Sequence, residues 1–362
     1  FKELKSTNPV FVIGNYRGGT TFLHRYLSFD YRRFTSMTGW EIFIAPSIVQ
    51  RKLMYLFVSL DQVFGSPIVR TFDHLWGKFA QGPVYFHQMG VREPEEDENL
   101  LAHIWSGTVA LNLFPDFEEG NMPGFAYYDR MLNQRQKERI MRFYHSCIQR
   151  HLYFHGGKKV YLSKSPSFSG HIETLIEAFP DAKFVYIVRT PYEVVPSSIN
   201  MWSFKWHVTL NPDEEYPYKE QILDMIKEYY LHPYEVLKKL PEDRYHFVYY
   251  DQLVENPEGS VQGIYDAFGF RIYPAFRRRL RRIIRRQENY KRPKMYSLKK
   301  MGLSNRWIFE NFKGVFKKFS LNPLRGAKIK LSKRPHRWPL LRKKSKNQNI
   351  KVPPPAIEHH TN

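Results

Sequence analysis

Short runs of apolar residues alternate with longer amphipathic stretches along most of the chain. Four runs rich in β-branched or aromatic residues predict buried parallel strands, because strands covered on both faces are apolar throughout. These runs are Val10–Ile13, Val160–Leu162, Phe184–Val188 and Phe247–Tyr250. The alternation of such runs with helical patterns predicts an α/β domain, in which a central parallel sheet is flanked by helices.

Three segments beside these runs predict helices. Thr21–Leu27 follows the first predicted strand directly, and Arg135–His151 is a long amphipathic segment. Gly170–Phe179 carries apolar residues at helical spacing and is followed by Pro180, which cannot continue a helix. Residues 42–158 show few strand patterns, and we interpret them as an insertion of helices and loops that shapes a substrate pocket.

Positive charge is concentrated in the last quarter of the chain. The net charge is +21, and residues 271–300 hold thirteen Lys or Arg against one Glu. Residues 325–346 hold ten Lys or Arg and no acidic residue. These segments are suited to nucleotide phosphates, an acidic polymer or an anionic membrane surface. A solvated helix face followed by a weakly ordered basic tail, residues 323–362, is the other interpretation, and the sequence leaves both open.

The chain contains one cysteine, Cys147, so it forms no internal disulfide and offers no cysteine cluster for a metal. This favours a reducing compartment such as the cytoplasm. The chain begins with Phe1 and not with methionine, so we expect native residues before it. A signal peptide or membrane anchor in such a segment is left open.

A glycine-containing turn joins the first predicted strand to the first predicted helix. Gly18 and Gly19 allow the backbone to approach an anion closely. The N–H groups of Gly19, Thr20 and Thr21 would face this anion at the positive end of the helix. Arg17 adds a planar fork of donors that suits phosphate or sulfonate oxygens. The turn is therefore predicted to bind phosphate.

This loop differs from that of the nucleotide triphosphatases, G-x-x-x-x-G-K-[ST]. Its cation, Arg17, precedes the glycines, and no Gly-Lys-Ser/Thr follows them. The loop resembles the 5′-phosphosulfate loop of sulfotransferases, (K/R)-S-G-T-T, with Gly18 at the position where serine is usual. This difference removes one side-chain donor and leaves the backbone cradle intact.

A second segment strengthens the resemblance. The strand Phe184–Val188 ends in Arg189, at the strand end where α/β sheets bind ligands. Pro191 follows two residues later, and Ser197 follows eight residues after the arginine. This spacing is similar to the 3′-phosphate site of sulfotransferases. A 3′-phosphate distinguishes the sulfuryl donor 3′-phosphoadenosine-5′-phosphosulfate (PAPS) from ATP.

The resemblance covers roughly residues 8–320 and is greatest to the bacterial-type, glycan- and tyrosine-directed branch of sulfotransferases. Tyr249–Leu253 with Pro257 is similar to the family's Y-E-D-L…P strand. The resemblance implies a P-loop-containing, nucleotide-hydrolase-like fold, a catalytic domain over residues 1–322, PAPS as co-substrate with 3′-phosphoadenosine 5′-phosphate (PAP) as product, and no metal. A basic stretch at Tyr290 and Lys291 is weakly similar to the family loop that adds a cation at the 3′-phosphate.

Sulfuryl transfer requires positive charge on the departing phosphate and a base for the acceptor. Arg17 is the first candidate for the bridging oxygen and the sulfuryl group. Lys164 is the second, because it follows a predicted strand at a place similar to the family's Lys-Thr-His segment. The cytosolic small-molecule enzymes carry a catalytic histidine there, whereas this chain has Pro166.

Glu41 is therefore the first candidate for the base. It lies 24 residues after Arg17, a separation similar to that in glycan- and tyrosine-directed sulfotransferases. Partial desolvation beside Trp40 would raise its pKa toward the useful range. The acidic run Glu96-Asp97-Glu98 is the alternative base, and a surface or helix-start role is open for both. The resemblance of the position of Glu41 to that of the base in glycan-directed sulfotransferases also implies a carbohydrate hydroxyl as acceptor, with an amine as another option.

Two other functions fit parts of the pattern. A P-loop nucleotide kinase or nucleotidase would depend on magnesium and ATP, against which stand the missing Gly-Lys-Ser/Thr and the Arg189 and Ser197 pair. A non-catalytic protein that binds polyanions or membranes through residues 271–346 would show steep salt dependence. No nucleic-acid partner is expected.

Overall fold

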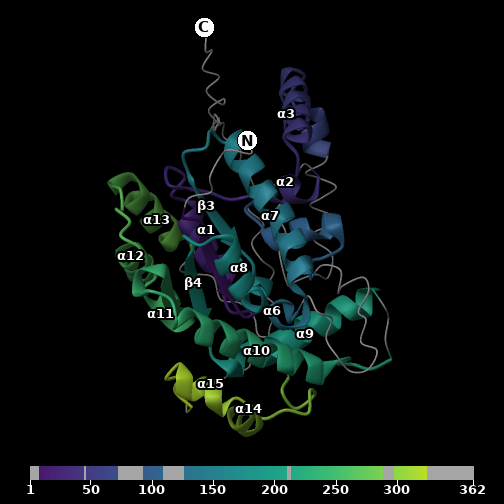
Figure 1. Ribbon diagram of the computed structural model, residues 1–362, viewed down its shortest axis with the longest axis vertical. Helices are drawn as coiled ribbons and strands as arrows, with labels where there is room; N and C mark the ends of the chain where they lie inside the picture. Colours follow the sequence, from purple (N-terminus) through teal and green to yellow (C-terminus); the bar gives the residue numbers. More distant parts are fainter. Residues whose placement is uncertain are drawn as a thin grey trace.

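The computed structural model describes residues 8–44, 46–71, 93–108, 126–209, 213–287 and 297–323. Five parallel strands form one central sheet in the order β2-β3-β1-β4-β5 (Figure 1). The strands are β1 (Val10–Gly14), β2 (Phe34–Thr35), β3 (Val160–Lys164), β4 (Lys183–Val188) and β5 (Tyr245–Tyr249). The four predicted strands are confirmed, although the last one begins earlier, at Tyr245, and ends before Tyr250. The two-residue β2 was not predicted, because so short a segment carries no periodicity.

Helices cover both faces of the sheet in the described parts of the chain (Figure 1). The longer α-helices are α1 (Thr20–Ser28), α3 (Ile48–Val63), α7 (Gln134–Phe154), α9 (Pro191–Thr209), α10 (Lys219–Leu237), α12 (Pro257–Ala267) and α13 (Pro274–Gln287). The shorter ones are α2 (Gly39–Phe43), α6 (Tyr128–Met131), α8 (Ile172–Ala178), α11 (Tyr250–Glu255), α14 (Asn305–Asn311) and α15 (Lys313–Lys318). Three 3₁₀ helices are η1 (Asp97–Ile104), η3 (Pro166–Gly170) and η4 (Glu242–Arg244).

The three predicted helices correspond to α1, α7 and α8. The prediction for Gly170–Phe179 began too early, because η3 continues to Gly170 before α8 starts. Pro166 starts η3, as its fixed φ angle favours the first helical position. Residues 42–158 contain α3, η1, α6 and α7 in their described parts.

The central strands are apolar because both of their faces are covered. Val10 and Val12 of β1 belong to the apolar cluster on the face of the sheet that also holds α1, α12 and α13. Phe11 and Ile13 point to the other face, toward α7, α8, α9 and α10. All residues of β1 and β4 are buried, which explains why these segments read as continuous apolar runs and not as alternating ones.

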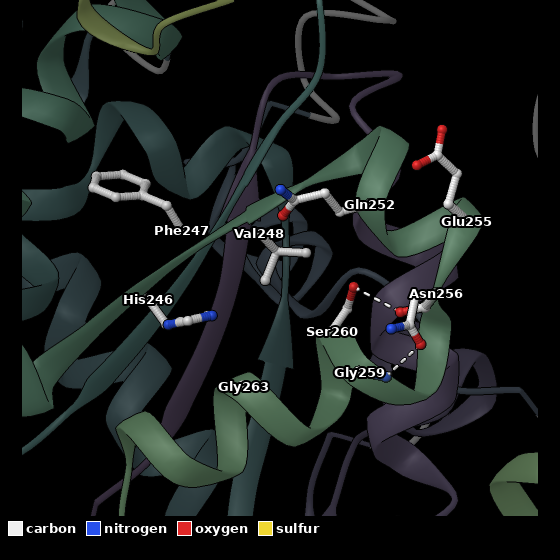
Figure 2. A pocket seen from close by; sticks show the side chains of 9 residues that line it. All are labelled: His246, Phe247, Val248, Gln252, Glu255, Asn256, Gly259, Ser260 and Gly263. Carbon is white, nitrogen blue, oxygen red and sulfur yellow. Dashed lines mark hydrogen bonds between the residues drawn. The ribbon is translucent and has the colours of Figure 1, made fainter.

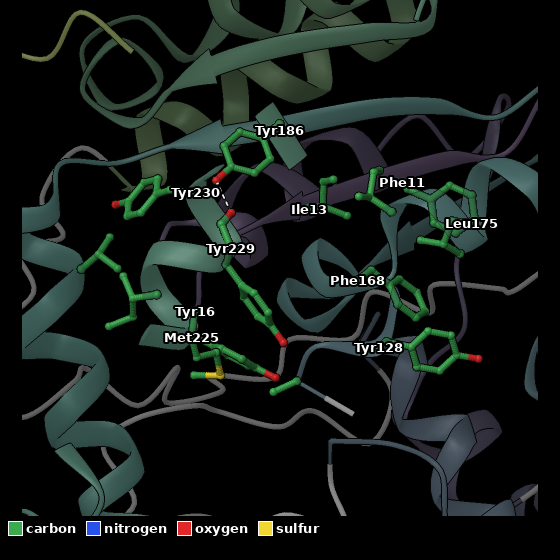
Figure 3. Close-up of a cluster of buried hydrophobic side chains, with 14 of the residues drawn as sticks. Phe11, Ile13, Tyr16, Tyr128, Phe168, Leu175, Tyr186, Met225, Tyr229 and Tyr230 are labelled. Carbon is green, nitrogen blue, oxygen red and sulfur yellow. Dashed lines mark hydrogen bonds between the residues drawn. The ribbon is translucent and has the colours of Figure 1, made fainter. Parts of the chain in front are cut away.

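Aromatic rings fill much of the core on the α7–α10 side (Figure 3). Phe11 stacks on Phe184 of the neighbouring strand, with ring centroids 5.5 Å apart. Tyr186 is fully buried, and its hydroxyl donates a hydrogen bond to the carbonyl oxygen of Tyr229 at 2.6 Å. Aromatic side chains thus supply much of the packing of this core, and the hydroxyl of Tyr186 is satisfied inside it.

The strand order places three functional loops at one edge. β1 is the middle strand and pairs with β3 on one side and β4 on the other, with Val12 opposite Lys164 and Gly14 opposite Ile187. A Cβ atom on Gly14 would lie 2.8 Å from the carbonyl oxygen of Ile187, so only glycine fits where β1 enters its loop. The carboxyl ends of β1, β3 and β4 therefore meet.

Among the described helices, none is both long enough and apolar enough to cross a membrane.

Candidate active site

The loop after β1 has the backbone geometry of an anion cradle. Arg17 has a φ angle of 64° and Gly19 one of 105°, so left-handed residues alternate with ordinary ones. Thr20 and Thr21 begin α1, where N–H groups have no intrahelical acceptor and the helix dipole is positive. A Cβ atom on Gly19 would lie 2.5 Å from the ring of Tyr250, so this position accepts only glycine.

The loops after β1 and β4 are in direct contact. Arg189 donates from Nη1 to the carbonyl oxygen of Arg17 at 2.7 Å, across 172 positions of the sequence. Arg17 in turn donates from Nε to the hydroxyl of Ser197 at 3.0 Å. The two predicted anion-binding motifs thus form one continuous cationic site at the carboxyl edge of the sheet.

Arg189 is held by two further contacts. Its Nε donates to Glu193 at 2.9 Å, one turn along α9. Its guanidinium lies over the ring of Tyr250, 4.1 Å from the ring centroid. Tyr250 therefore contacts Gly19 on the first loop and Arg189 on the second. Its part in the site was not predicted, although the sequence pattern around it had been recognised.

Lys164 reaches the same site from the end of β3. Its side chain is fully buried, and Nζ lies 3.1 Å from Glu96 Oε1 and 3.4 Å from the hydroxyl of Thr21. The Glu96 side chain keeps 22% exposure. The structure thus brings together Arg17, Lys164 and the loop, as the sequence predicted, and adds the carboxylate of Glu96.

The three acidic residues of the run at 96–98 have different surroundings. Asp97 is buried and accepts hydrogen bonds from Tyr144 at 2.5 Å, Tyr161 at 2.7 Å and Ser163 at 2.9 Å. These bonds fix the start of η1 against the end of β3. They thereby place Glu96 beside Lys164.

Glu98 is buried as well, and it accepts from both the backbone N–H and the hydroxyl of Thr108, at 2.6 and 2.9 Å. Burial raises the pKa of Glu98 to about 7, against the hydrogen bonds from Thr108, which lower it. Of the three acids, Glu96 alone combines partial exposure with a direct contact to Lys164.

The surroundings of Glu41 differ from what the sequence led us to expect. Its carboxylate accepts hydrogen bonds from the backbone N–H and the hydroxyl of Thr38, both at 2.9 Å, in a capping box at the start of α2. The same carboxylate lies 3.3 Å from Arg51 Nη1 and 3.1 Å from His155 Nε2. These contacts tie Glu41 to α3 and α7.

The expectation of a raised pKa for Glu41 is wrong. Burial alone would raise this pKa, but His151, His155 and Arg51 outweigh burial and hold it well below its usual range. Burial also lowers the pKa of His151 to about 4, so this histidine is neutral at pH 7 and the permanent charge beside Glu41 is that of Arg51. Glu41, His151 and His155 lie close enough to hold a metal. However, Arg51 Nη1 lies 3.2 Å from His151 Nδ1, so a guanidinium already lies beside these candidate metal ligands.

Lys205 was missed in the sequence. It follows Ser197 by eight residues on α9, a spacing that places both on one helix face and was the available signal. Burial lowers the pKa of Lys205, Glu96 and Glu98 raise it, and Arg17 lowers it further, so this cation shares the field of the site. Tyr290 and Lys291, the predicted extra contacts to a 3′-phosphate, lie outside the described residues.

A pocket of about 400 Å³ lies beside the edge strand β5 (Figure 2). It is lined by residues of β5, α11 and α12, among them His246, Asn256 and Gly263. The cations of the two motifs do not line it. The pocket is therefore separate from the edge of the sheet that carries the two motifs.

The fold and this edge together are those of an α/β protein with a P-loop-like turn that differs from the nucleotide triphosphatase type. A sequence profile described as "Sulfotransferase family" matches residues 9–274. This match spans most of the chain, which therefore belongs to the sulfotransferase family.

Curated relatives support the same family. The chain is 27% identical over 297 residues to proteins named omega-hydroxy-beta-dihydromenaquinone-9 sulfotransferase Stf3, from Mycobacterium bovis and Mycobacterium tuberculosis. The matched region covers 78% of this chain and 68% of each relative.

Solved structures show the same fold. Sulfotransferase STF9 from Mycobacterium avium superposes with a TM-score of 0.69 at 17% identity, covering 88% of this chain and 78% of that one. Sulfotransferase STF1 from Mycobacterium tuberculosis H37Rv superposes with a TM-score of 0.65 at 22% identity, covering 86% and 78%.

The raised pKa of Glu98 predicts a specific dependence of stability on pH. The folded protein holds the proton of Glu98 more tightly than the unfolded chain, so this residue costs stability as the pH rises from the unfolded pKa to about 7. Relative to E98Q, the wild type should lose about 3 kcal/mol of unfolding free energy over this range. Urea unfolding of both proteins at several pH values measures the difference.

The exposed Glu138 of α7 provides the control for this experiment. E138Q should follow the wild type at each pH. If the unfolding free energies of wild type and E98Q changed with pH in the same way, the raised pKa of Glu98 would be contradicted.

Proposed function

We propose that this sulfotransferase uses PAPS as donor and transfers its sulfuryl group to an acceptor hydroxyl. The observation that carries the proposal is the contact of Arg189 with the carbonyl oxygen of Arg17, at 2.7 Å. It joins a loop suited to a 5′-phosphosulfate to a strand end suited to a 3′-phosphate. A single nucleotide phosphorylated at both positions is the ligand that such a double site fits best.

Each part of the donor has a proposed partner. The 5′-phosphosulfate binds over the N–H groups at the start of α1, with Arg17 and Lys164 supplying positive charge. The 3′-phosphate binds beside Arg189 and Ser197, where the guanidinium is already oriented by Glu193 and Tyr250. Because these donors are fixed before the ligand arrives, binding loses little side-chain entropy.

The proposed transfer is a single in-line displacement. The acceptor oxygen forms a bond to sulfur while the bond between sulfur and the bridging oxygen of the 5′-phosphate breaks, and PAP leaves with that electron pair. Arg17 and Lys164 stabilise the charge that develops on the departing oxygen. The acceptor proton passes to a carboxylate, for which we propose Glu96.

Glu96 fits this role better than the other acids do. It is partly exposed, so an acceptor can reach it, and it lies 3.1 Å from Lys164 Nζ. When the donor binds, its sulfuryl group competes with Glu96 for Lys164 and leaves the carboxylate more basic. Glu41 is engaged with Thr38 and Arg51, while Asp97 and Glu98 are buried and held by hydroxyl and backbone donors.

For the acceptor we propose a hydroxyl group on an apolar molecule. The earlier expectation of a carbohydrate depended on Glu41 as base, and the contacts of Glu41 remove that reason. The relatives at 27% identity are named for a hydroxylated menaquinone, an apolar acceptor. Assays with labelled PAPS against a long-chain alcohol, an oligosaccharide and an amine compare the options, and faster sulfation of the oligosaccharide would reverse this choice.

The donor assignment predicts a large effect of Arg189→Ala. Loss of a charged donor from the 3′-phosphate should weaken binding of PAP by about 10- to 100-fold, as charge-assisted hydrogen bonds contribute about 1.5–3 kcal/mol. Binding of ADP, which lacks that phosphate, should change much less. Isothermal titration of both nucleotides measures the two affinities.

The exposed Lys239 offers a matched control, because K239A also removes one positive charge but lies outside both motifs. K239A should bind PAP as the wild type does. Unchanged PAP affinity in R189A, or stronger thermal stabilisation of the wild type by ADP with magnesium than by PAP, would contradict the donor assignment.

The base assignment predicts that Glu96→Gln lowers kcat by about 10²- to 10⁴-fold, the usual contribution of a general base. PAP binding should persist, because the amide still accepts a hydrogen bond from Lys164. Single-turnover assays with bound PAPS measure the effect. Glu41→Gln, assayed at a temperature where it is folded, should retain turnover. If E41Q lost turnover and E96Q kept it, Glu41 and not Glu96 would be the base.

A further inference from the structure

Helix α3 is built with its polar side inward and its apolar side outward. Its two buried residues are the charged Arg51 and Asp61. An outward stripe, which we call the α3 stripe, is formed by Val49, Leu53, Leu56, Phe57, Leu60 and Phe64, the last at the C-cap. Phe57 is 64% exposed and Phe64 is 78% exposed, whereas apolar groups of this size are usually buried.

Polar anchors hold the helix in this orientation. Arg51 contacts Glu41 at 3.3 Å and His151 at 3.2 Å, which fixes the first half of α3 against α2 and α7. Asp61 accepts hydrogen bonds from the N–H groups of Ile68 and Val69, both at 2.9 Å, and so fixes the turn that follows. If α3 rotated so that the stripe faced inward, Arg51 and Asp61 would lose their present partners. Each charge would then be either exposed to water or buried without a partner.

The stripe is continuous and accessible. Its members recur at intervals of three or four residues, so they lie along one side of the helix. Figure 1 shows α3 projecting away from the sheet, beyond α2 and the end of α7. In the described part of the chain, α3 thus has the apolar spacing of a core-facing helix although every residue of the stripe is at least 49% exposed.

We propose that α3 is an interfacial helix that inserts its apolar stripe into the surface of an anionic lipid bilayer. Its 16 residues extend for about 24 Å, and it lies among the described helices that cannot cross a membrane. A helix of this kind lies in the plane of the interface, with its apolar side toward the acyl chains and its polar side toward the protein.

Charge selects an anionic bilayer over a second copy of the chain as the partner. The chain carries a net charge of +21, so two copies repel each other, while anionic lipids attract it. Exposed cations lie on and after these helices: Lys52 lies on α3, Arg70 follows α3 in the sequence and Lys158 follows α7. The helix α13 contributes seven arginines and no acidic residue to the positive charge of the chain. The inference concerns where the enzyme works, and it does not rest on the identity of its donor or acceptor.

Co-sedimentation of the full chain with vesicles tests the inference. The wild type should bind vesicles of equal parts phosphatidylcholine and phosphatidylglycerol, and bind phosphatidylcholine alone more weakly. Removal of two large apolar groups in F57S/F64S should weaken binding to the mixed vesicles roughly tenfold or more. V208S/V254S is the matched control, because Val208 and Val254 are also exposed apolar residues but lie on α9 and α11. It should bind as the wild type does.

Two further measurements keep the outcome clear. PAP affinity and thermal unfolding of F57S/F64S should equal those of the wild type, which shows that the fold and the donor site are intact whatever the donor proves to be. The inference is overturned if the wild type does not sediment with the mixed vesicles, or if F57S/F64S binds them equally well. It is also overturned if analytical ultracentrifugation without lipid shows a dimer that F57S/F64S dissociates.

Discussion

The site depends on the close contact of two loops that parallel strand pairing brings together. β1 and β4 are neighbours in the sheet, so the loop that carries Arg17 and the strand end that carries Arg189 meet at one edge. The guanidinium of Arg189 donates to the backbone of Arg17, and the guanidinium of Arg17 donates to Ser197. Each cation is thus oriented by the other motif. Such mutual orientation fixes the donors in advance, as the proposed binding of the donor nucleotide requires.

Some of the surrounding residues hold the site in place, and others are placed to take part in the proposed reaction. Asp97 fixes η1 against β3 and so places Glu96 beside Lys164. Tyr250 lies between the two loops, because it contacts Gly19 and supports Arg189. The acidic run that looked like one unit in the sequence therefore contains an anchor, a buried acceptor and one partly exposed carboxylate. In this account catalysis results from positioning and from positive charge at the departing oxygen.

The strands and the turn between β1 and α1 could be predicted because they depend on local patterns. β1 is apolar throughout, β4 is apolar after its first residue Lys183, and the glycines of the first loop are required by its backbone. Tertiary contacts escaped prediction. The environment of Glu41 is set by Arg51, His151 and His155, and no spacing rule connects these residues, so the direction of its pKa shift was wrong. Lys205 differs from Glu41 in this respect, because its helical spacing from Ser197 is visible in the sequence and could have indicated its place near the site. The outward stripe of α3 has the same periodicity as a buried helix face, which the sequence cannot distinguish.

The most direct test of the account is a crystal structure of the protein with PAP. The account predicts one nucleotide per chain, with its 5′-phosphate bound by the N–H groups of Thr20 and Thr21 and its 3′-phosphate bound by Arg189 and Ser197. Density for the nucleotide elsewhere, such as the pocket beside β5, would contradict it. A nucleotide that contacts the first loop and leaves Arg189 and Ser197 unoccupied would contradict it as well.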